Sequence, residues 1–346
     1  RANIESAQSI RGIPPSEMMI PYPSIRSLLD SQVRRYGDRT FLYWRENGEN
    51  RDASFNAFFD RVSQCANYLR REKVAFGDTV AVSGTGLYRS LIELFGTWAV
   101  GGTVSFDSKD SPFPSEANLF DDALAEEPKV AEVGKKSKLA DDCLTLENDN
   151  DRTVVLSHYN LIVNGMAIAE RLQFNDKDTL SADGERVNLL TIAGAVMTGL
   201  YAGSRIDLRG ERASNQEIRA IFTHRLQDAP LAKSAVVPHS TGNRKYQGSV
   251  VTGFFIPELT GFASLGSSPT EDEEELIHVG LPLHPCEMTI LDEEGKELTE
   301  GQLGRLAVRG HNVMKGYAKD EEANRNIFSG GWLNTGSSAE ARKNTD

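Results

Sequence analysis

The sequence predicts an α/β protein in which helices alternate with the strands of a parallel sheet. Apolar side chains recur at helical spacing in three stretches, and short apolar runs bounded by turn residues lie between these stretches. The predicted helices are 27–36, 54–69 and 87–100, and the predicted strands are 40–44, 79–82 and 103–107. Because strands that are connected through helices usually pair in parallel, this order predicts βα units.

The middle of the chain continues the same alternation. Residues 153–156 form a predicted strand that leads through Ser157, a candidate N-cap, into a helix. Apolar spacing predicts helices over 189–201 and 216–224, and residues 116–133 are predicted to form an acidic helix on the surface.

Composition and charge narrow the class of protein. The 346 residues suffice for two or three subdomains with a sizeable core, and 38 basic against 50 acidic side chains give a net charge of −12. That balance argues against nucleic-acid binding as the main activity. The three cysteines, Cys65, Cys143 and Cys286, lack the spacing of a zinc site or a disulfide framework. With no apolar run of about 20 residues and no apolar signal core, we expect a cytoplasmic protein.

Turn-forming residues are dense between Gly301 and Gly336, and the order of three short motifs there is distinctive. The run reads GQLGRLAVRGHNVMKGYAKDEEANRNIFSGGWLNTG, with a predicted strand at 305–308 and a polar helix over 320–326. A further predicted strand, 288–292, precedes the run. Gly-Gln-Leu, Gly-Tyr and Gly-Trp-x-x-Thr-Gly follow one another at the spacing of the adenylate-forming superfamily. The chain therefore resembles acyl-CoA synthetases, luciferases and the adenylation domains of peptide synthetases.

This resemblance implies the architecture of the large N-terminal domain of those enzymes. That domain has two βα subdomains with stacked sheets and a small β-barrel. In this chain the resemblance places the first subdomain at 1–165, a shortened second subdomain at 166–275, and the barrel with the ribose-site segment at 276–346. The family's C-terminal lid domain has no counterpart in the printed sequence.

A second match to the family follows residue 153. Family members place a Ser/Thr-His-x-Asn-Leu segment after the strand that leaves their phosphate loop, and this chain has Ser157-His158-Tyr159-Asn160-Leu161. As an isolated residue, His158 fits a packed or capping histidine better than a catalytic base.

The segment just before that match departs from the family. Where members have a glycine-rich loop and Pro-Lys-Gly, residues 147–153 contain no glycine and carry Glu147, Asp149 and Asp151, which would repel a triphosphate. Glycines matter in such a loop because they let backbone N–H groups converge on the anion. Arg152 stands at the lysine-like position and offers one cationic donor for nucleotide. Either acid activation has been lost, or the printed chain omits residues between about 148 and 153.

The resemblance implies further nucleotide-site residues after the strand that begins at Ser249. In the family's Gly-Tyr-Gly-x-Thr-Glu motif the aromatic stacks on adenine, the threonine contacts phosphate and the glutamate binds Mg²⁺. In the same register Phe254 takes the aromatic place, Phe255 replaces a glycine, Pro257 replaces the threonine and Glu258 keeps the carboxylate. Glu258 is thus the expected catalytic residue and metal ligand, since a carboxylate oxygen suits a hard cation.

The last expected site segment ends the glycine-dense run. Thr335 and Gly336 match the family's Thr-Gly-Asp, whose aspartate accepts hydrogen bonds from both ribose hydroxyls, and Ser337 stands in the place of that aspartate. A serine hydroxyl lacks the charge-assisted strength of a carboxylate.

Together these matches imply a ligase. The expected reaction is the activation of a fatty or other carboxylic acid by ATP and Mg²⁺ to an acyl-adenylate, followed by transfer to coenzyme A. A small-molecule acid is then the expected partner. The alternative is a non-catalytic relative that binds nucleotide or acyl groups.

Overall fold

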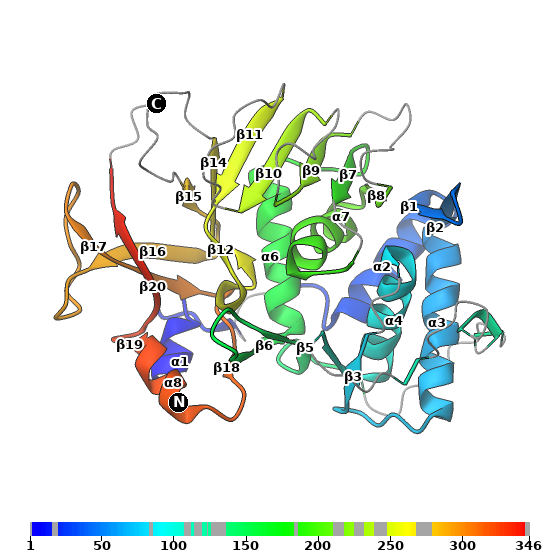
Figure 1. Cartoon of the computed structure of the whole chain (residues 1–346), viewed down its shortest axis with the longest axis horizontal. Coiled ribbons are helices and arrows are strands. Elements are labelled where there is room, and N and C mark those ends of the chain that lie inside the picture. Colours follow the sequence, from blue (N-terminus) through cyan, green and yellow to red (C-terminus); the bar gives the residue numbers. More distant parts are fainter. Residues whose placement is uncertain are drawn as a thin grey trace.

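The computed structural model confirms an α/β architecture with two large sheets and a smaller curled sheet (Figure 1). The residues that the structure describes are 2–15, 20–82, 86–106, 112–113, 120–122, 124–125, 136–182, 186–209, 218–224, 232–238, 248–267 and 279–342.

The first sheet has five strands in the order β18-β6-β5-β4-β3. Strands β3, β4 and β5 are parallel, whereas β6 pairs antiparallel with β5 and with β18. The bounds are β3 Thr79–Ala81, β4 Thr103–Ser105, β5 Asp142–Glu147, β6 Thr153–Ser157 and β18 Gly316–Tyr317. Helix α4 (Leu87–Val100) connects β3 to β4, and α3 (Phe55–Arg71) leads into β3 from the second sheet, so helices and strands alternate as predicted.

The second sheet has nine strands in the order β15-β14-β11-β10-β9-β7-β8-β1-β2. Its six central strands run parallel, and antiparallel strands close both edges. The bounds are β1 Thr40–Glu46, β2 Glu49–Ser54, β7 Thr179–Ala182, β8 Arg205–Asp207, β9 Ala220–Phe222, β10 Ser234–Pro238, β11 Ser249–Gly253, β14 Ser264–Ser267 and β15 Leu281–Pro282.

Helix α6 (His158–Arg171) runs through the centre of the molecule (Figure 1). Its residues 158–169 are all buried, so this helix packs on every side. Ser157 is its N-cap as predicted, and the Ser157 N–H donates to Asn160 Oδ1, which completes a capping box. The π-helix η2 (Leu190–Val196) and α7 (Met197–Ala202) pack against α6, and α2 (Ile25–Tyr36) packs against α7.

The third sheet is antiparallel, with the order β16-β17-β20-β19. Its strands are β16 Cys286–Leu291, β17 Leu303–Gly310, β19 Phe328–Ser329 and β20 Trp332–Glu340. Helix α8 (Glu321–Ile327) starts at its N-cap Asp320. The N-terminal helix α1 (Ala2–Ala7) contacts β17, β19 and β20, so both ends of the described chain meet at this sheet (Figure 1).

One predicted helix is wrong, and another predicted helix falls mostly outside the described residues. Residues 220–222 form β9 and not part of a helix over 216–224, because Ala220, Ile221 and Phe222 are fully buried between two parallel neighbours. Most of the acidic segment 116–133 lies outside the described residues. The division of the chain into subdomains at residues 165 and 275 stays a prediction. Strands β1 and β2, which precede residue 165, belong to the nine-stranded sheet. No described helix is long and apolar enough to span a membrane.

His158 is a packed residue in this fold. Its ring is 1% exposed and lies edge-on to Trp98, with ring centroids 6.3 Å apart. Burial lowers the pKa of His158 from 6.5 to about 4, although Asp141 and Asp142 partly oppose that shift. The folded protein therefore holds this ring neutral, whereas the unfolded chain protonates it near pH 6.5.

We expect His158 to make the protein acid-sensitive. The pKa of His158 is lower in the folded protein than in the unfolded chain, so its contribution to the free energy of unfolding is complete above pH 6.5 and is lost as the pH falls toward 4. Between pH 7.5 and pH 5 this loss amounts to about 2 kcal/mol. Urea unfolding of the wild type and of His158→Asn at both pH values measures this, and the variant is expected to lose less stability. Equal losses in the two proteins would contradict the assignment.

Candidate active site

A buried carboxylate is the centre of the candidate site. Glu258 lies in the short 3₁₀ helix η5 (Pro257–Leu259) and is 7% exposed. Its Oε1 accepts hydrogen bonds from Asn148 Nδ2 at 2.7 Å and from Tyr317 Oη at 2.8 Å. A buried charge is stable only when its polar atoms are paired, and these two donors meet that need on one oxygen. No described residue bonds to the other oxygen, Oε2.

Asn148 also closes the hairpin turn between β5 and β6. Its Oδ1 accepts from the backbone N–H groups of Asn150 and Arg152, each at 3.0 Å. Asp151 adopts a left-handed backbone with φ 55°, which an aspartate tolerates better than most residues do. One side chain therefore shapes the turn with its oxygen and binds Glu258 with its nitrogen. The described turn has no glycine-rich loop where the family resemblance implies one.

Tyr317 joins Arg152 to the same cluster. Strand β18 pairs with β6 so that Tyr317 lies opposite Val154, two residues after Arg152. The Arg152 guanidinium carbon lies 5.6 Å from the Tyr317 ring centroid, and its Nε lies 3.4 Å from Asp320 Oδ2. Burial and the neighbouring Glu258 raise the pKa of Tyr317, so the hydroxyl remains a donor at neutral pH. The structure thus brings the predicted residues Arg152 and Glu258 to one place.

The aromatic residues before Glu258 differ in exposure. Phe254 is 4% exposed and packs in the core, whereas Phe255, in β12 (Phe255–Ile256), is half-buried. The Phe255 ring meets Phe262 edge-on at 4.9 Å between centroids. Pro257 opens η5, and its carbonyl accepts from the N–H of Thr260 at 2.9 Å. Of the two phenylalanines, Phe255 has the ring that is accessible to a base.

Thr335, Gly336 and Ser337 belong to β20. Thr335 Oγ1 donates to the carbonyl of Leu306 at 2.8 Å and accepts from the N–H of Ser337 at 3.2 Å. Gly336 has φ 74°, a backbone that favours glycine. No hydrogen bond or ion pair among the described residues joins this segment to Glu258, so its ribose-binding role stays a prediction.

Sequence reasoning missed Asn148 and Tyr317 as parts of the site. For Tyr317 the signal was present, because it lies in the Gly-Tyr motif of the glycine-dense run. For Asn148 the signal was weaker. An Asn-Asp-Asn-Asp stretch is typical of a turn whose side chains bond to the backbone, but the partner 110 positions away is not visible in the sequence.

Glu258 fits a magnesium ion only as one ligand among several. The described residues contain no group of three or more His, Cys, Asp or Glu side chains able to hold a metal. Protein sites for Mg²⁺ often supply one or two carboxylates and leave the other positions to water and substrate phosphates. The unbonded Oε2 suits that arrangement.

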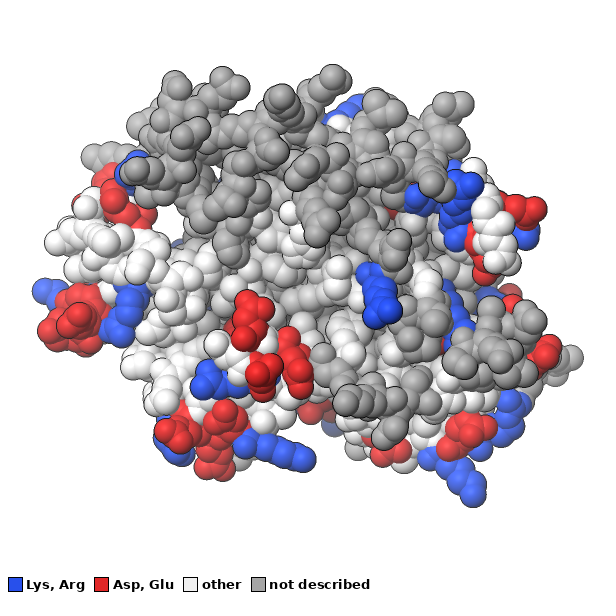
Figure 2. All heavy atoms as spheres, in the orientation of Figure 1, with Lys and Arg blue, Asp and Glu red and all other residues white. Residues whose placement is uncertain are grey.

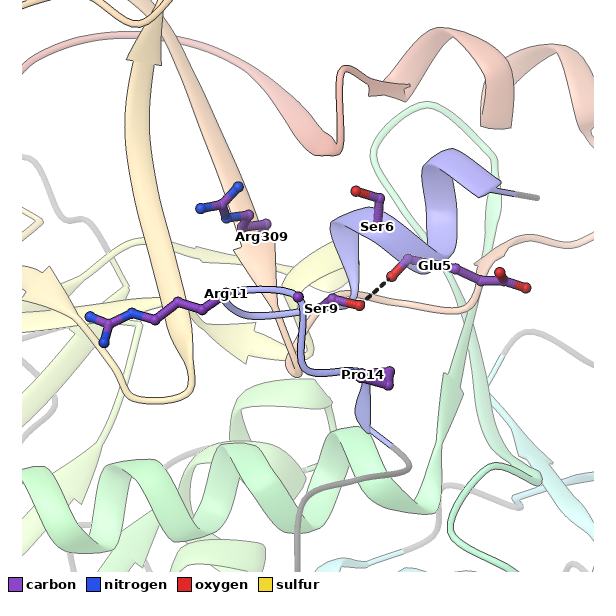
Figure 3. Close-up of a pocket in the computed structure, with 7 residues that line it drawn as sticks. Glu5, Ser6, Ser9, Arg11, Pro14 and Arg309 are labelled. Atoms are coloured by element: carbon purple, nitrogen blue, oxygen red, sulfur yellow. Dashed lines mark hydrogen bonds between the residues drawn. The ribbon is translucent and has the colours of Figure 1, made fainter.

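A cavity lies away from this cluster, beside α1 (Figure 3). It has a volume of about 330 Å³ and contains none of the predicted site residues. Arg11 and Arg309, on its wall, both pair with Glu287, at 3.4 and 2.6 Å, so two guanidinium groups share one carboxylate. On the face shown in Figure 2, the described acidic side chains are interspersed with basic ones.

The comparisons with known proteins agree with the fold and the motifs. Residues 185–318 match the sequence model of the family described as AMP-binding enzyme. The Klebsiella oxytoca NpsA N-terminal subdomain in complex with 3-hydroxyanthranilyl-AMSN superposes with a TM-score of 0.78 at 14% identity, covering 93% of this chain and 97% of that one. The anthranilate CoA ligase AuaEII in complex with anthranoyl-AMP superposes with a TM-score of 0.78 at 15% identity, covering 94% of this chain and 76% of that one.

Curated relatives match over shorter stretches. The 2-succinylbenzoate–CoA ligase of Bacillus velezensis is 26% identical over 179 residues, which is 51% of this chain and 34% of that protein. The long-chain-fatty-acid–CoA ligase of Escherichia coli O157:H7 is 37% identical over 90 residues, or 25% and 16% of the two chains. The matched part is thus about a third or less of each relative's length. The chain therefore shares the fold of these solved structures, as predicted, and its residues 185–318 resemble the AMP-binding enzyme family.

We expect Tyr317→Phe to destabilise the protein by about 1–3 kcal/mol, because the variant removes a donor from a buried carboxylate. Denaturant unfolding measures this loss. In Glu258→Gln the charge is already gone, so adding Tyr317→Phe is expected to cost less than it does alone. Tyr22→Phe, in a half-buried ring outside the cluster, serves as the control. Additive losses in the double variant would show that the hydroxyl does not stabilise Glu258.

Proposed function

We propose that the chain provides the acid- and nucleotide-binding part of an acid–CoA ligase. In this reaction a carboxylic acid attacks the α-phosphorus of ATP, pyrophosphate leaves, and the acyl-adenylate then passes its acyl group to coenzyme A. The observation that carries the proposal is the Glu258 cluster, which lies in a fold of the adenylate-forming type beside the motif that resembles the family's nucleotide site.

Each residue of the cluster has a role in this proposal. Glu258 Oε2 would hold Mg²⁺, which when bound supplies neutralising charge to the phosphates. Arg152 would release Asp320 and donate to a phosphate oxygen, since an arginine fork suits that anion. The half-buried Phe255 would stack on the base, with Thr335, Gly336 and Ser337 at the ribose. Positioning and charge neutralisation then lower the barrier, because the attacking and leaving groups need to be held in line.

The proposed acid is a small carboxylic acid. Relatives include ligases for 2-succinylbenzoate and for long-chain fatty acids, and two structural neighbours hold anthranilyl or anthranoyl compounds. These names differ in the size of the acid, so they support the reaction class more than one substrate. A cytoplasmic location, where ATP and coenzyme A are available, belongs to the same proposal.

A second candidate is a non-catalytic binder of nucleotide or acyl groups. The turn at 148–152 favours it, because this turn is closed by Asn148 and lacks the backbone cradle that glycines make. Arg152 is also paired with Asp320. The two candidates differ in turnover and not in binding.

Acid-dependent exchange of pyrophosphate into ATP separates the candidates. A ligase is expected to catalyse this exchange with Mg²⁺, and Glu258→Gln is expected to lower its rate by at least about 100-fold, because a charged ligand at the reacting phosphates is lost. Glu49→Gln, an exposed carboxylate of β2, is the matched control and is expected to keep the rate.

A binder gives a different set of results. Thermal stabilisation by ATP or by an acyl-adenylate analogue, without exchange under any acid, would favour the non-catalytic reading. If neither thermal stabilisation nor pyrophosphate exchange is observed, both candidates are contradicted.

A further inference from the structure

The pocket beside α1 combines two guanidinium groups with a cavity that admits a small molecule (Figure 3). Its volume of about 330 Å³ lies at the lower end of the range for small-molecule sites, which is roughly 300–1,000 Å³. Arg11 comes from the N-terminal segment and Arg309 from β17, so the pocket joins two segments that are far apart in the sequence. Ser6 and Ser9 add hydroxyl groups to its wall.

The two guanidinium groups carry one more positive charge than their shared partner neutralises. Both donate to Glu287 through Nε, Arg309 to Oε2 at 2.6 Å and Arg11 to Oε1 at 3.4 Å. A guanidinium has five N–H donors, and no described residue bonds to the terminal nitrogens of either group. Glu5 also lies on the wall, but its carboxylate points away from both guanidinium groups (Figure 3). The pocket therefore offers several charged donors to an anion.

The two arginines differ in how firmly they are held. The Arg309 guanidinium carbon lies 4.2 Å from the Trp332 ring centroid, which is a cation–π contact, and its side chain is 34% exposed. The Arg11 side chain is 86% exposed, and its bond of 3.4 Å to Glu287 is long for a charge-assisted hydrogen bond. Because an exposed ion pair contributes little to stability, Arg11 can turn to a ligand while Arg309 stays in place.

The backbone presents Arg11 in a tight turn. Ile10 and Ile13 exchange backbone hydrogen bonds at 3.0 and 2.8 Å, so Arg11 and Gly12 form a two-residue loop. Both loop residues have positive φ, 50° and 78°, as in type I′ turns, where Asn-Gly is preferred. An arginine at the first position is less favourable than an asparagine. The turn alone does not explain this residue, whereas a ligand for its guanidinium does.

A phosphate group matches this arrangement better than a carboxylate does. A carboxylate has two oxygens, which one guanidinium fork can occupy. A phosphate monoester has three acceptor oxygens and a charge of about −1.5 to −2 at pH 7, so it can accept from two arginines at once. The Ser6 hydroxyl, to which no described residue bonds, provides a further donor on the same wall.

We propose that the pocket beside α1 binds the phosphate group of a small ligand, free phosphate or a phosphate monoester, between Arg11 and Arg309. The cavity contains none of the residues assigned to the acid or to ATP, so this site is additional to the proposed function. Arg309 positions the anion through its terminal nitrogens, and Arg11 closes on it from the turn.

Calorimetry on the full chain tests the site with three probes at one ionic strength: inorganic phosphate, ribose 5-phosphate and ribose. Saturable binding of at least one phosphate-bearing probe, and not of ribose, is expected. Tighter binding of ribose 5-phosphate than of inorganic phosphate would identify an ester as the ligand. Equal affinities would identify the free anion, and both results support the site.

Variants locate the bound anion. Arg11→Asn and Arg309→Gln are each expected to weaken binding by about 10-fold or more, because each removes a charged donor. Arg11→Asn introduces a residue that suits the turn, so it is expected to fold even if Arg309→Gln does not. Arg51→Gln, in an exposed arginine of β2, makes the same change of net charge elsewhere and is expected to keep the affinity.

Three results would overturn the proposal. The first is that neither phosphate-bearing probe binds saturably. The second is that Arg51→Gln weakens binding as much as Arg11→Asn does, which would indicate attraction by net charge alone. The third is that Arg11→Asn binds as tightly as the wild type while Arg152→Gln does not, which would place the anion at the candidate active site.

Discussion

The need to pair one buried carboxylate connects the parts of this molecule that form the candidate site. Glu258 is nearly inaccessible to water, so its charge depends on donors brought by other elements. Asn148 arrives from the β5–β6 turn and Tyr317 from β18. Asn148 directly follows β5, and Tyr317 lies in β18. Both strands pair antiparallel with β6, so the registers of these two ladders bring both donors to the carboxylate.

The segment 311–317 is held by a second set of long-range bonds. Asn160 donates to the carbonyls of His311 and Val313 from within its own capping box, and Tyr159 Oη bonds to His311 Nδ1 at 2.7 Å. The N–H of Met314 donates to the carbonyl of Glu258 at 2.8 Å. Helix α6 therefore fixes the path of the chain that carries Tyr317, and the glycine-dense run matters here as a structural support as well as a motif.

Much of the fold was predictable because its signals are local. Ser157 and Asp320 cap the helices that they were predicted to begin, and the strands at 153–156 and 305–308 follow their apolar patterns. The segment 216–224 was misread because a short apolar run has no periodicity of its own, and only burial between β7 and β10 makes it a strand. Of the site, Arg152 and Glu258 were predictable as neighbours through the family register.

The sequence by itself determined the fold class, the family resemblance and the residue types available for chemistry, because caps, turns and motif spacings act over a few residues. Only the tertiary structure decided how those residues are used. It buries Phe254 and leaves Phe255 accessible, and it makes Asn148 both the turn former and the partner of Glu258. It also buries the side-chain oxygens of Asn164 and Asn312 without a hydrogen-bond partner among the described residues. These outcomes depend on burial and on hydrogen bonds between distant segments, which no local pattern encodes.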